Sequence, residues 1–596
     1  MAVTGVVANG ESDEPLLNSS SNHGGERNNS SFVEGVVDYR GGRVINRSKY
    51  GGWRSASFII GLDIAETFTY FGITSNLISY LTGPLRLSTV TAAQNINAWA
   101  GVVWMLPLLG AFVADSYLGR FRTIIFSSLI YILGPGLLAL SATAPSLRPP
   151  DCPNNSESNT SCTSPSSFQV IFFFFSLYLV AIGCAGYKPC TQAFGADQFD
   201  GQNTEECKWK GSFFNLWTFG LCFGGIISHL TLNYIQDNIG WGLGFGIPCI
   251  FMAIALIVFL FGTKTYRYSK TEDKENPMLR IGRVFVAAVK NWRTTKSSWA
   301  TIEEEETGLP CCLRVGDHQF KFLDKALIDT SNDAIGSRKH GLPCSVSQVE
   351  DAKAVLCLFP IWITCLMYAV VATQSTTFFA KQASTLDRSL GPNFQIPAAA
   401  IQMFISLSLI LFIIIYDRLF VPMARAFTGK PNGITTLQRI GSGIFISTIT
   451  MALAAIVEKK RLQTALDFGL IDMPKATIPM SLWWLIPQYV LLGLATLFTM
   501  IGLQEFFYDQ VPDGLRSIGL SLYSSIFGVG SFLSGFIISV IDKVTSRRGH
   551  YSWFSDNLNR AHLDYFYWVL VGLSVVQFVA YLYFSNSYLY KRRASM

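Results

Sequence analysis

The sequence predicts an all-α membrane protein with twelve transmembrane helices. Half of its 596 residues are hydrophobic and only 14% are charged, whereas a soluble domain usually carries about 25% charged residues. Its long runs without Asp, Glu, Lys or Arg match the roughly 20 apolar residues that a membrane helix needs. A charged segment separates six such spans from six more. We therefore expect two six-helix bundles.

The spans differ in their charge. Two of them, at about 56–81 and 168–192, contain Asp63, Glu66 and Lys188. A charge inside a bilayer is costly and usually functional. These side chains therefore indicate a translocation pathway, with Lys188 as a substrate anchor and Asp63 and Glu66 as candidates for proton coupling. The charge-free spans are 87–114, 123–147, 211–236, 238–263, 354–380, 389–416, 440–457, 476–504, 517–541 and 565–590.

Composition also sets the expected regions. They are a disordered cytosolic tail (1–50), the first six-helix bundle (51–263), a cytosolic linker (264–351), the second six-helix bundle (352–590) and a short cytosolic tail (591–596). Apolar residues at helical spacing in the linker are flanked by basic residues, which predicts an amphipathic helix on the membrane surface. A plain linker helix is the open alternative. The apolar residues are Ile281, Val284, Phe285, Ala288, Val289 and Trp292.

Basic residues suggest the orientation. Arg120 and Arg122 follow the second span, and positive loops favour the cytosol. The loop 143–167 would then face outward; it holds two glycosylation sequons. Cys152 and Cys162 flank the sequons, and whether they form a disulfide stays open. The orientation signal from basic residues is otherwise weak. The loop expected after the ninth span would lie on the outer side, yet it would hold Lys459, Lys460 and Arg461.

Two helix ends suggest an internal repeat. The second span ends in Gly110–Arg122, which contains Asp115, Arg120 and Arg122, and the eighth ends in Asp417 and Arg418. An acid and nearby arginines at a helix end are candidates for gates that lock and release neighbouring helices. Matching gates in two six-helix halves suggest repeats around a central site. For the eighth span, ordinary interfacial charge is the alternative.

These motifs resemble the plant nitrate and peptide transporter family, within the proton-dependent oligopeptide transporters of the major facilitator superfamily. The resemblance covers about residues 35–590 and implies the major facilitator fold and secondary transport of a small solute. We find no nucleophile elbow and no phosphate-binding loop, and we expect no enzyme activity. The matching stretches are Gly110–Arg122, Gly183–Cys190, Phe194–Asp200, Asp387–Ser389, Ile396–Ala398, Tyr416–Arg418, Ile486–Tyr489 and Gln504–Tyr508.

The chain departs from the family pattern at two charges. The family's Glu-x-x-Glu-Arg (or Lys) becomes Asp63-x-x-Glu66-Thr67, and the glutamate of the tenth span becomes Thr496. One acid and one base are lost together, so the expected site charge stays at about −1 and no single charge is stranded. Lys188 is then expected to pair with Asp63 or Glu66. The charge switch between the halves is missing, so we expect weakened or altered proton coupling.

These departures leave several functions open. The leading one is alternating-access transport, secondary-active or facilitative, of nitrate or another organic anion, a hormone or a glycoside. The alternatives are a solute sensor with low flux and a fully proton-coupled nitrate or peptide symporter. The candidate substrate-binding residues are Lys188, Tyr70, Gln374, Thr376, Thr496, Trp483 and Tyr523.

The expected partners are few. They are a small solute, the lipid bilayer and protons if coupling survives; we expect no cofactor, no metal and no nucleic acid. Asp13–Leu17 resembles an acidic dileucine signal for sorting adaptors. The plasma membrane and the vacuolar membrane remain alternatives, and the substrate, transport direction and oligomeric state stay open.

Overall fold

The computed structural model describes most of both bundles and part of the linker. The predicted sorting signal Asp13–Leu17, the Cys152–Cys162 pair and the tail 591–596 lie outside the described residues. The described residues are 33, 36–44, 49–148, 165–200, 203–269, 277–292, 320, 322–327, 344–392, 394–429, 434–511, 515–546 and 552–588.

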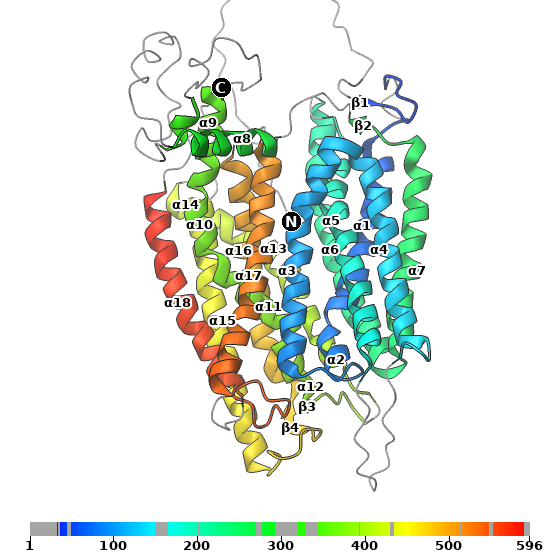
Figure 1. The fold of residues 1–596 in the computed structure, drawn as a ribbon, viewed down its shortest axis with the longest axis vertical. Helices are drawn as coiled ribbons and strands as arrows, with labels where there is room; N and C mark the ends of the chain where they lie inside the picture. The colour runs from blue at the N-terminus through cyan, green and yellow to red at the C-terminus, as the bar shows by residue number, and fades with distance from the viewer. Residues whose placement is uncertain are drawn as a thin grey trace, which may run out of the picture.

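The first half consists of six membrane spans (Figure 1). Gly119 ends the second span with a φ of 76°, a left-handed conformation that glycine adopts without strain. The elements are α1 (Gly52–Thr74), α2 (Leu77–Thr82), α3 (Thr89–Val113), the π-turn η1 (Ala114–Leu118), α4 (Arg120–Thr143), α5 (Ser167–Ala196), α6 (Thr204–Asn238), α7 (Trp241–Phe261) and η2 (Gly262–Lys264).

The second half repeats this plan with more broken helices. Its first span is bent by 44° between Val346–Thr364 and Leu366–Ser384. The linker elements are α8 (Pro277–Lys290) and η3 (Leu323–Leu327). The bundle elements are α9 (Val346–Cys357), α10 (Phe359–Thr364), α11 (Leu366–Thr373), η5 (Gln374–Thr376), α12 (Phe378–Ser384), η6 (Ala398–Gln402), α13 (Met403–Ile415), the π-turn η7 (Tyr416–Phe420), α14 (Val421–Thr428), α15 (Thr436–Asp467), η8 (Leu482–Leu485), α16 (Ile486–Asp509), α17 (Arg516–Thr545) and α18 (Leu563–Ser587).

One short two-stranded sheet lies at each end of the molecule. At the end that carries the linker, β1 (Val36–Val37) pairs antiparallel with β2 (Tyr268–Ser269). At the opposite end, β3 (Leu386–Asp387) pairs parallel with β4 (Ile478–Ser481). We call these the linker end and the far end; they are the top and the bottom of Figure 1.

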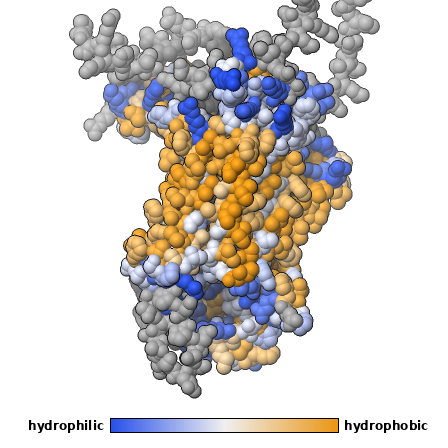
Figure 2. All heavy atoms as spheres, turned by 90° about the vertical axis from the view of Figure 1, so that its right-hand side faces the viewer, coloured by the Kyte–Doolittle hydropathy of each residue, from blue (hydrophilic) through white to orange (hydrophobic). Residues whose placement is uncertain are grey.

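The prediction of twelve membrane helices is confirmed. In the described part of the chain, eleven helices are long and apolar enough to cross a membrane, and the bent pair supplies the twelfth. Figure 2 shows a broad apolar surface between two more polar ends, which is the pattern of a multi-pass membrane protein. The two six-helix bundles stand side by side (Figure 1).

The predicted linker helix exists as α8. Its Ile281, Val284 and Ala288 are buried in one cluster with side chains of η3 and α9, and Arg280 pairs with Asp351 of α9 at 2.7 Å. The helix is therefore docked on the second half through one apolar face. Other apolar side chains of this segment are exposed, namely Leu279, Val286 and Val289 on the helix and Trp292 just after it.

The two halves are joined at the far end. The Lys381 ammonium donates a hydrogen bond to the Thr82 hydroxyl at 2.8 Å, and the Asn97 amide donates one to the Ser534 hydroxyl at 3.1 Å. Each bond links one bundle to the other and keeps the far end closed in this conformation. Other links at this end are Thr89–Asp556, Gln94–Ser539, Ser75–Gln402 and Asp237–Arg388.

The ninth span differs from the prediction. Arg461 was expected in a loop, yet α15 continues to Asp467 and buries both Arg461 and Glu458 completely. The arginine forms two hydrogen bonds with Glu458, at 2.6 and 2.8 Å, and another with Asn559 at 3.0 Å. Three consecutive basic residues indicated a helix end, but only Lys459 and Lys460 are exposed.

This buried pair gives a test of the fold. Removing one partner of a buried ion pair costs about 3–5 kcal/mol, because the other charge is left uncompensated. We therefore expect Arg461→Met to lower the melting temperature of the purified protein markedly, while Lys459→Ala on the same helix leaves it unchanged. The double variant Glu458→Gln/Arg461→Met should recover part of the loss. Equal melting temperatures for Arg461→Met and Lys459→Ala would contradict the burial of this pair.

Candidate substrate site

Lys188 lies at the centre of the candidate site. Its ammonium is 3.8 Å from a carboxylate oxygen of Glu66, and 27% of its side chain remains exposed. The same ammonium lies 4.1 Å from the ring centre of Tyr70 and 5.3 Å from that of Trp104. A cation over aromatic faces is attracted by the rings. Lys188 is thus held by one carboxylate and two rings while part of it stays accessible.

Local sequence explains this placement. Glu66 and Tyr70 are four residues apart on α1, so they share one face. On α5, Gly183 and Gly186 allow α4 to approach closely: a Cβ at Gly186 would lie 2.1 Å from the Ser127 hydroxyl. Small residues permit such close helix packing in membranes. The glycines therefore fix α5 and the lysine that follows them.

Asp63 lies beside this pair but has other partners. The Tyr187 hydroxyl donates a hydrogen bond to one carboxylate oxygen at 2.8 Å, and the Trp217 indole donates one to the other oxygen at 2.7 Å. Asp63 is 3% exposed. The sequence left Asp63 and Glu66 open as partners of Lys188, and the structure places Lys188 within ion-pair distance of Glu66.

The second half contributes hydroxyl groups and rings. The Tyr368 hydroxyl donates a hydrogen bond to Thr496 at 3.3 Å. Tyr523 and Tyr368 both pack against Phe527, with ring centres 5.5 and 6.2 Å away. Phe527 in turn lies 5.0 Å from Trp104 of the first half. These contacts connect Thr496 and Tyr523 to the surroundings of Lys188 through aromatic packing.

Three predicted binding residues lie elsewhere in this conformation. Gln374 is buried and donates a hydrogen bond to Ser534 at 3.2 Å, so it belongs to the far-end closure. Thr376 donates to the backbone carbonyl of Thr373. Trp483 is 42% exposed, and its ring packs against Phe404. The structure therefore brings Lys188, Glu66, Asp63 and Tyr70 together and connects Thr496 and Tyr523 to them only through intervening rings. It places Gln374, Thr376 and Trp483 elsewhere.

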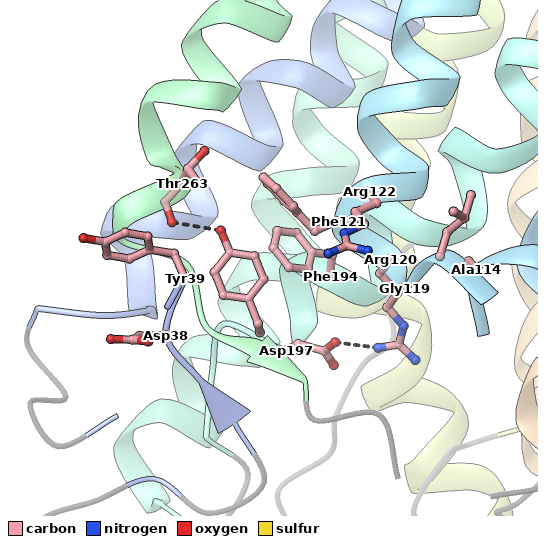
Figure 3. Close-up of a pocket in the computed structure, with 12 residues that line it drawn as sticks. Asp38, Tyr39, Ala114, Gly119, Arg120, Phe121, Arg122, Phe194, Asp197 and Thr263 are labelled. Atoms are coloured by element: carbon pink, nitrogen blue, oxygen red, sulfur yellow. Dashed lines mark hydrogen bonds and ion pairs between the residues drawn. The ribbon is translucent and has the colours of Figure 1, made fainter. Parts of the chain in front are cut away.

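The predicted gate of the first half surrounds a pocket at the linker end. Arg120 pairs with Asp197 at 2.5 Å. Figure 3 shows this pair, with Arg122 and Tyr39, around a cavity of about 440 Å³. Asp115 falls in the π-turn η1, and its side chain is outside the described set. The arginine that starts the third span thus holds the acid that ends the fourth.

The second half has a counterpart that the sequence analysis missed. Arg439 starts α15, Glu505 lies near the end of α16, and their charged atoms are 3.4 Å apart. These are the ninth and tenth spans, six helices after those of Arg120 and Asp197. Asp417 and Arg418 are exposed in the π-turn η7, which matches η1 in place. Asp197 and Glu505 both lie in family-like stretches and could have been found there.

No metal site is apparent in the part of the chain that the structure describes, since no group of three or more His, Cys, Asp or Glu side chains is suitably placed. The site chemistry is that of one partly accessible cation, its carboxylate partner and a second carboxylate with neutral donors. Hydroxyl groups of the second half are connected to it through aromatic packing.

Comparisons with known proteins agree with this architecture. A family model described as "PTR2: POT family" matches residues 121–554. The Arabidopsis thaliana relative "Protein NRT1/ PTR FAMILY 5.10" is 57% identical over 94% of this chain and 96% of its own length. "Protein NRT1/ PTR FAMILY 5.14" of the same plant is 52% identical over 94% of this chain and 97% of its own.

Solved structures share the fold at low sequence identity. An auto-inhibited POT family peptide transporter is 20% identical, with a TM-score of 0.66 over 91% of this chain and 99% of that one. A POT family transporter crystallised with 5-aminolevulinic acid is 14% identical, with a TM-score of 0.61 over 91% of this chain and 99% of that one. By its family match and its plant relatives, the chain belongs to the POT (NRT1/PTR) family and is a multi-pass membrane transporter rather than an enzyme.

Proposed function

We propose that this transporter moves a small monoanionic solute by alternating access, with Lys188 as the anchor for the anion and with weak proton coupling. The observation that carries the proposal is the Lys188–Glu66 pair, whose atoms are 3.8 Å apart while part of the lysine stays exposed. A close charge-assisted hydrogen bond between nitrogen and oxygen is about 2.7–2.9 Å long. The pair is therefore loose enough for a substrate anion to replace Glu66.

The second half supports a neutral binding partner for the rest of the solute. Thr496 and Tyr368 form a hydroxyl pair at the place where the family pattern has an acid. A dipeptide carries both an ammonium and a carboxylate, and each needs an opposite charge when it leaves water. Hydroxyl groups suit an anion with an uncharged, hydrogen-bonding body better than they suit a zwitterion.

Alternating access is supported by the two kinds of contact between helices. Links such as Lys381–Thr82 close the halves at the far end. Pairs within each half, Arg120–Asp197 and Arg439–Glu505, hold helix ends together at the linker end. We assign the linker end to the cytosol and the far end to the outside or the vacuolar lumen; the carrier resides in the plasma membrane or the vacuolar membrane.

Weak proton coupling follows from the missing charges. A switch between the halves needs an ion pair that forms and breaks as protons bind. Neither Thr67 nor Thr496 can supply a charge. Asp63 is engaged with neutral donors, and Glu66 is the acid next to Lys188. Movement is then driven mainly by the gradient of the anion or by the membrane potential.

The anchor role of Lys188 can be separated from a structural role. We expect Lys188→Ala to reduce uptake of a radiolabelled anion about tenfold or more, the loss that follows removal of a hydrogen bond to a charged group. The control Lys459→Ala, an exposed lysine, should transport normally. The panel should contain nitrate, monocarboxylates, glycoside anions and a dipeptide, measured in proteoliposomes.

A double variant decides the outcome. If the lysine only neutralises Glu66, then Lys188→Ala/Glu66→Gln removes both charges and should restore uptake. If the lysine holds the anion, the double variant stays inactive. Restored uptake of the anions, or dipeptide uptake exceeding that of every anion in the unmodified protein, would contradict the proposed function.

The coupling claim gives a prediction about pH. Uptake by the unmodified protein should differ by less than about twofold between about pH 5.5 and about pH 7.5 on the outside. Thr67→Arg/Thr496→Glu should steepen this dependence, because it returns one base and one acid. Either change alone adds an unpaired charge near the site and should lower uptake. A several-fold stimulation at acid pH in the unmodified protein, abolished by a protonophore, would show that Asp63 and Glu66 suffice for coupling.

A further inference from the structure

We propose that Trp217 and Tyr187 are positioning residues that hold Asp63 as a fixed hydrogen-bond acceptor, apart from the exchangeable Lys188–Glu66 pair. The two acids of one helix motif then have different roles. This inference rests on the proposed function for its effect on transport, but the contact itself can be tested without transport.

Each carboxylate oxygen of Asp63 accepts a hydrogen bond from one of these two donors, and the Thr191 hydroxyl of α5 also interacts with the carboxylate. The Tyr187 hydroxyl, from α5, is 2.8 Å from Oδ1, and the Trp217 Nε1, from α6, is 2.7 Å from Oδ2. The side chains of Asp63, Tyr187 and Trp217 are at most 7% exposed. Three helices of the first half therefore meet at this carboxylate, and its orientation is determined by both bonds.

The two donors differ in what they permit. An indole N–H only donates, whereas a tyrosine hydroxyl both donates and accepts. A proton on Oδ2 of Asp63 would therefore face the Trp217 N–H with no acceptor between them. A proton on Oδ1 could still be accommodated if the Tyr187 hydroxyl turned to accept it. Trp217 is thus the group that opposes protonation of Asp63, and Tyr187 is the more permissive partner.

The other titratable and charged groups around Asp63 come from three helices. Glu66 and Tyr70 lie on α1 itself, Cys184 and Lys188 on α5, and Tyr131 on α4. The Cys184 sulfur lies 3.7 Å from a Glu66 oxygen, and the Tyr131 hydroxyl donates to the backbone carbonyl of Glu66 at 3.4 Å. Cys184, Tyr131 and Lys188 contact Glu66, and the charge of Glu66 in turn acts on Asp63. From α6, the contact to Asp63 is the neutral indole.

The consequence is a carrier in which a neighbouring tryptophan favours the ionised form of its first acid, because an N–H donor bonds a carboxylate more strongly than a carboxylic acid. Removing the N–H while keeping an aromatic side chain should make Asp63 easier to protonate. Trp217→Phe makes this change, and Trp209→Phe, at an exposed tryptophan of the same helix, is its matched control. Tyr187→Phe removes the permissive partner.

The first measurement is uptake of the transported anion at about pH 5.5 and about pH 7.5, with and without a protonophore. We expect Trp217→Phe to become several-fold more active at the acid pH and sensitive to the protonophore. Trp209→Phe should keep the shallow profile of the unmodified protein, and Tyr187→Phe should shift it less than Trp217→Phe does. A well-expressed Trp217→Phe variant with an unchanged pH profile would overturn the proposal.

The second measurement needs no substrate. Infrared difference spectra of the purified full-length protein report the carbonyl band of a protonated carboxyl group, and loss of the band in Asp63→Asn assigns it. In Trp217→Phe this band should persist to a pH about one unit higher than in the unmodified protein, a tenfold change in proton affinity. The same pH in both proteins, or no band in either, overturns the positioning role. If no anion is transported, the proposed function fails and these spectra alone decide the inference.

Discussion

The need to keep one lysine charged inside a membrane protein constrains the rest of the site. Lys188 lies within an apolar bundle, where an ammonium group is costly unless it has partners. Its position over Tyr70 and Trp104, and next to Glu66, provides attraction from several directions without enclosing it fully. A tighter pair would be more stable and harder for a solute to open. The observed distance of 3.8 Å is consistent with an exchangeable pair.

The two halves have similar supports at the linker end and different chemistry at the centre. Arg120–Asp197 and Arg439–Glu505 occupy matching places six helices apart, and each half has a π-turn at its second span. Such repeats suit a rocking motion around a central site. At the centre, Asp63, Glu66 and Lys188 lie in the first half, whereas Thr496 of the second half pairs with the Tyr368 hydroxyl. Substrate binding would therefore combine a charged face with a neutral one.

The sequence predicted the elements that depend on local pattern. Charge-free runs predicted ten of the twelve spans, and the other two were the apolar runs that carry Asp63, Glu66 and Lys188, whose isolated charges indicated the candidate site. Long-range partners could not be predicted in this way. Trp217 lies 154 residues from Asp63 in the chain, and no periodicity relates them.

Two further differences have physical causes. The run Lys459–Arg461 resembles a helix end, but one of its members is buried because Glu458, three residues earlier on the same helix, neutralises it. Gln374 has the polarity expected of a pocket wall, yet its amide contacts Ser534 and belongs to the closed far end. The sequence does not distinguish a residue that binds solute from one that closes the path, because both roles favour uncharged polar side chains between the halves.

The central claim is that the solute anion replaces Glu66 at Lys188. A structure of the full-length protein with a transported anion bound tests it most directly. The account predicts the negative group of the anion at about 3 Å from the Lys188 ammonium, with Glu66 moved away and Asp63 still held by Trp217 and Tyr187. An anion bound away from Lys188, with the Lys188–Glu66 pair unchanged, would contradict it.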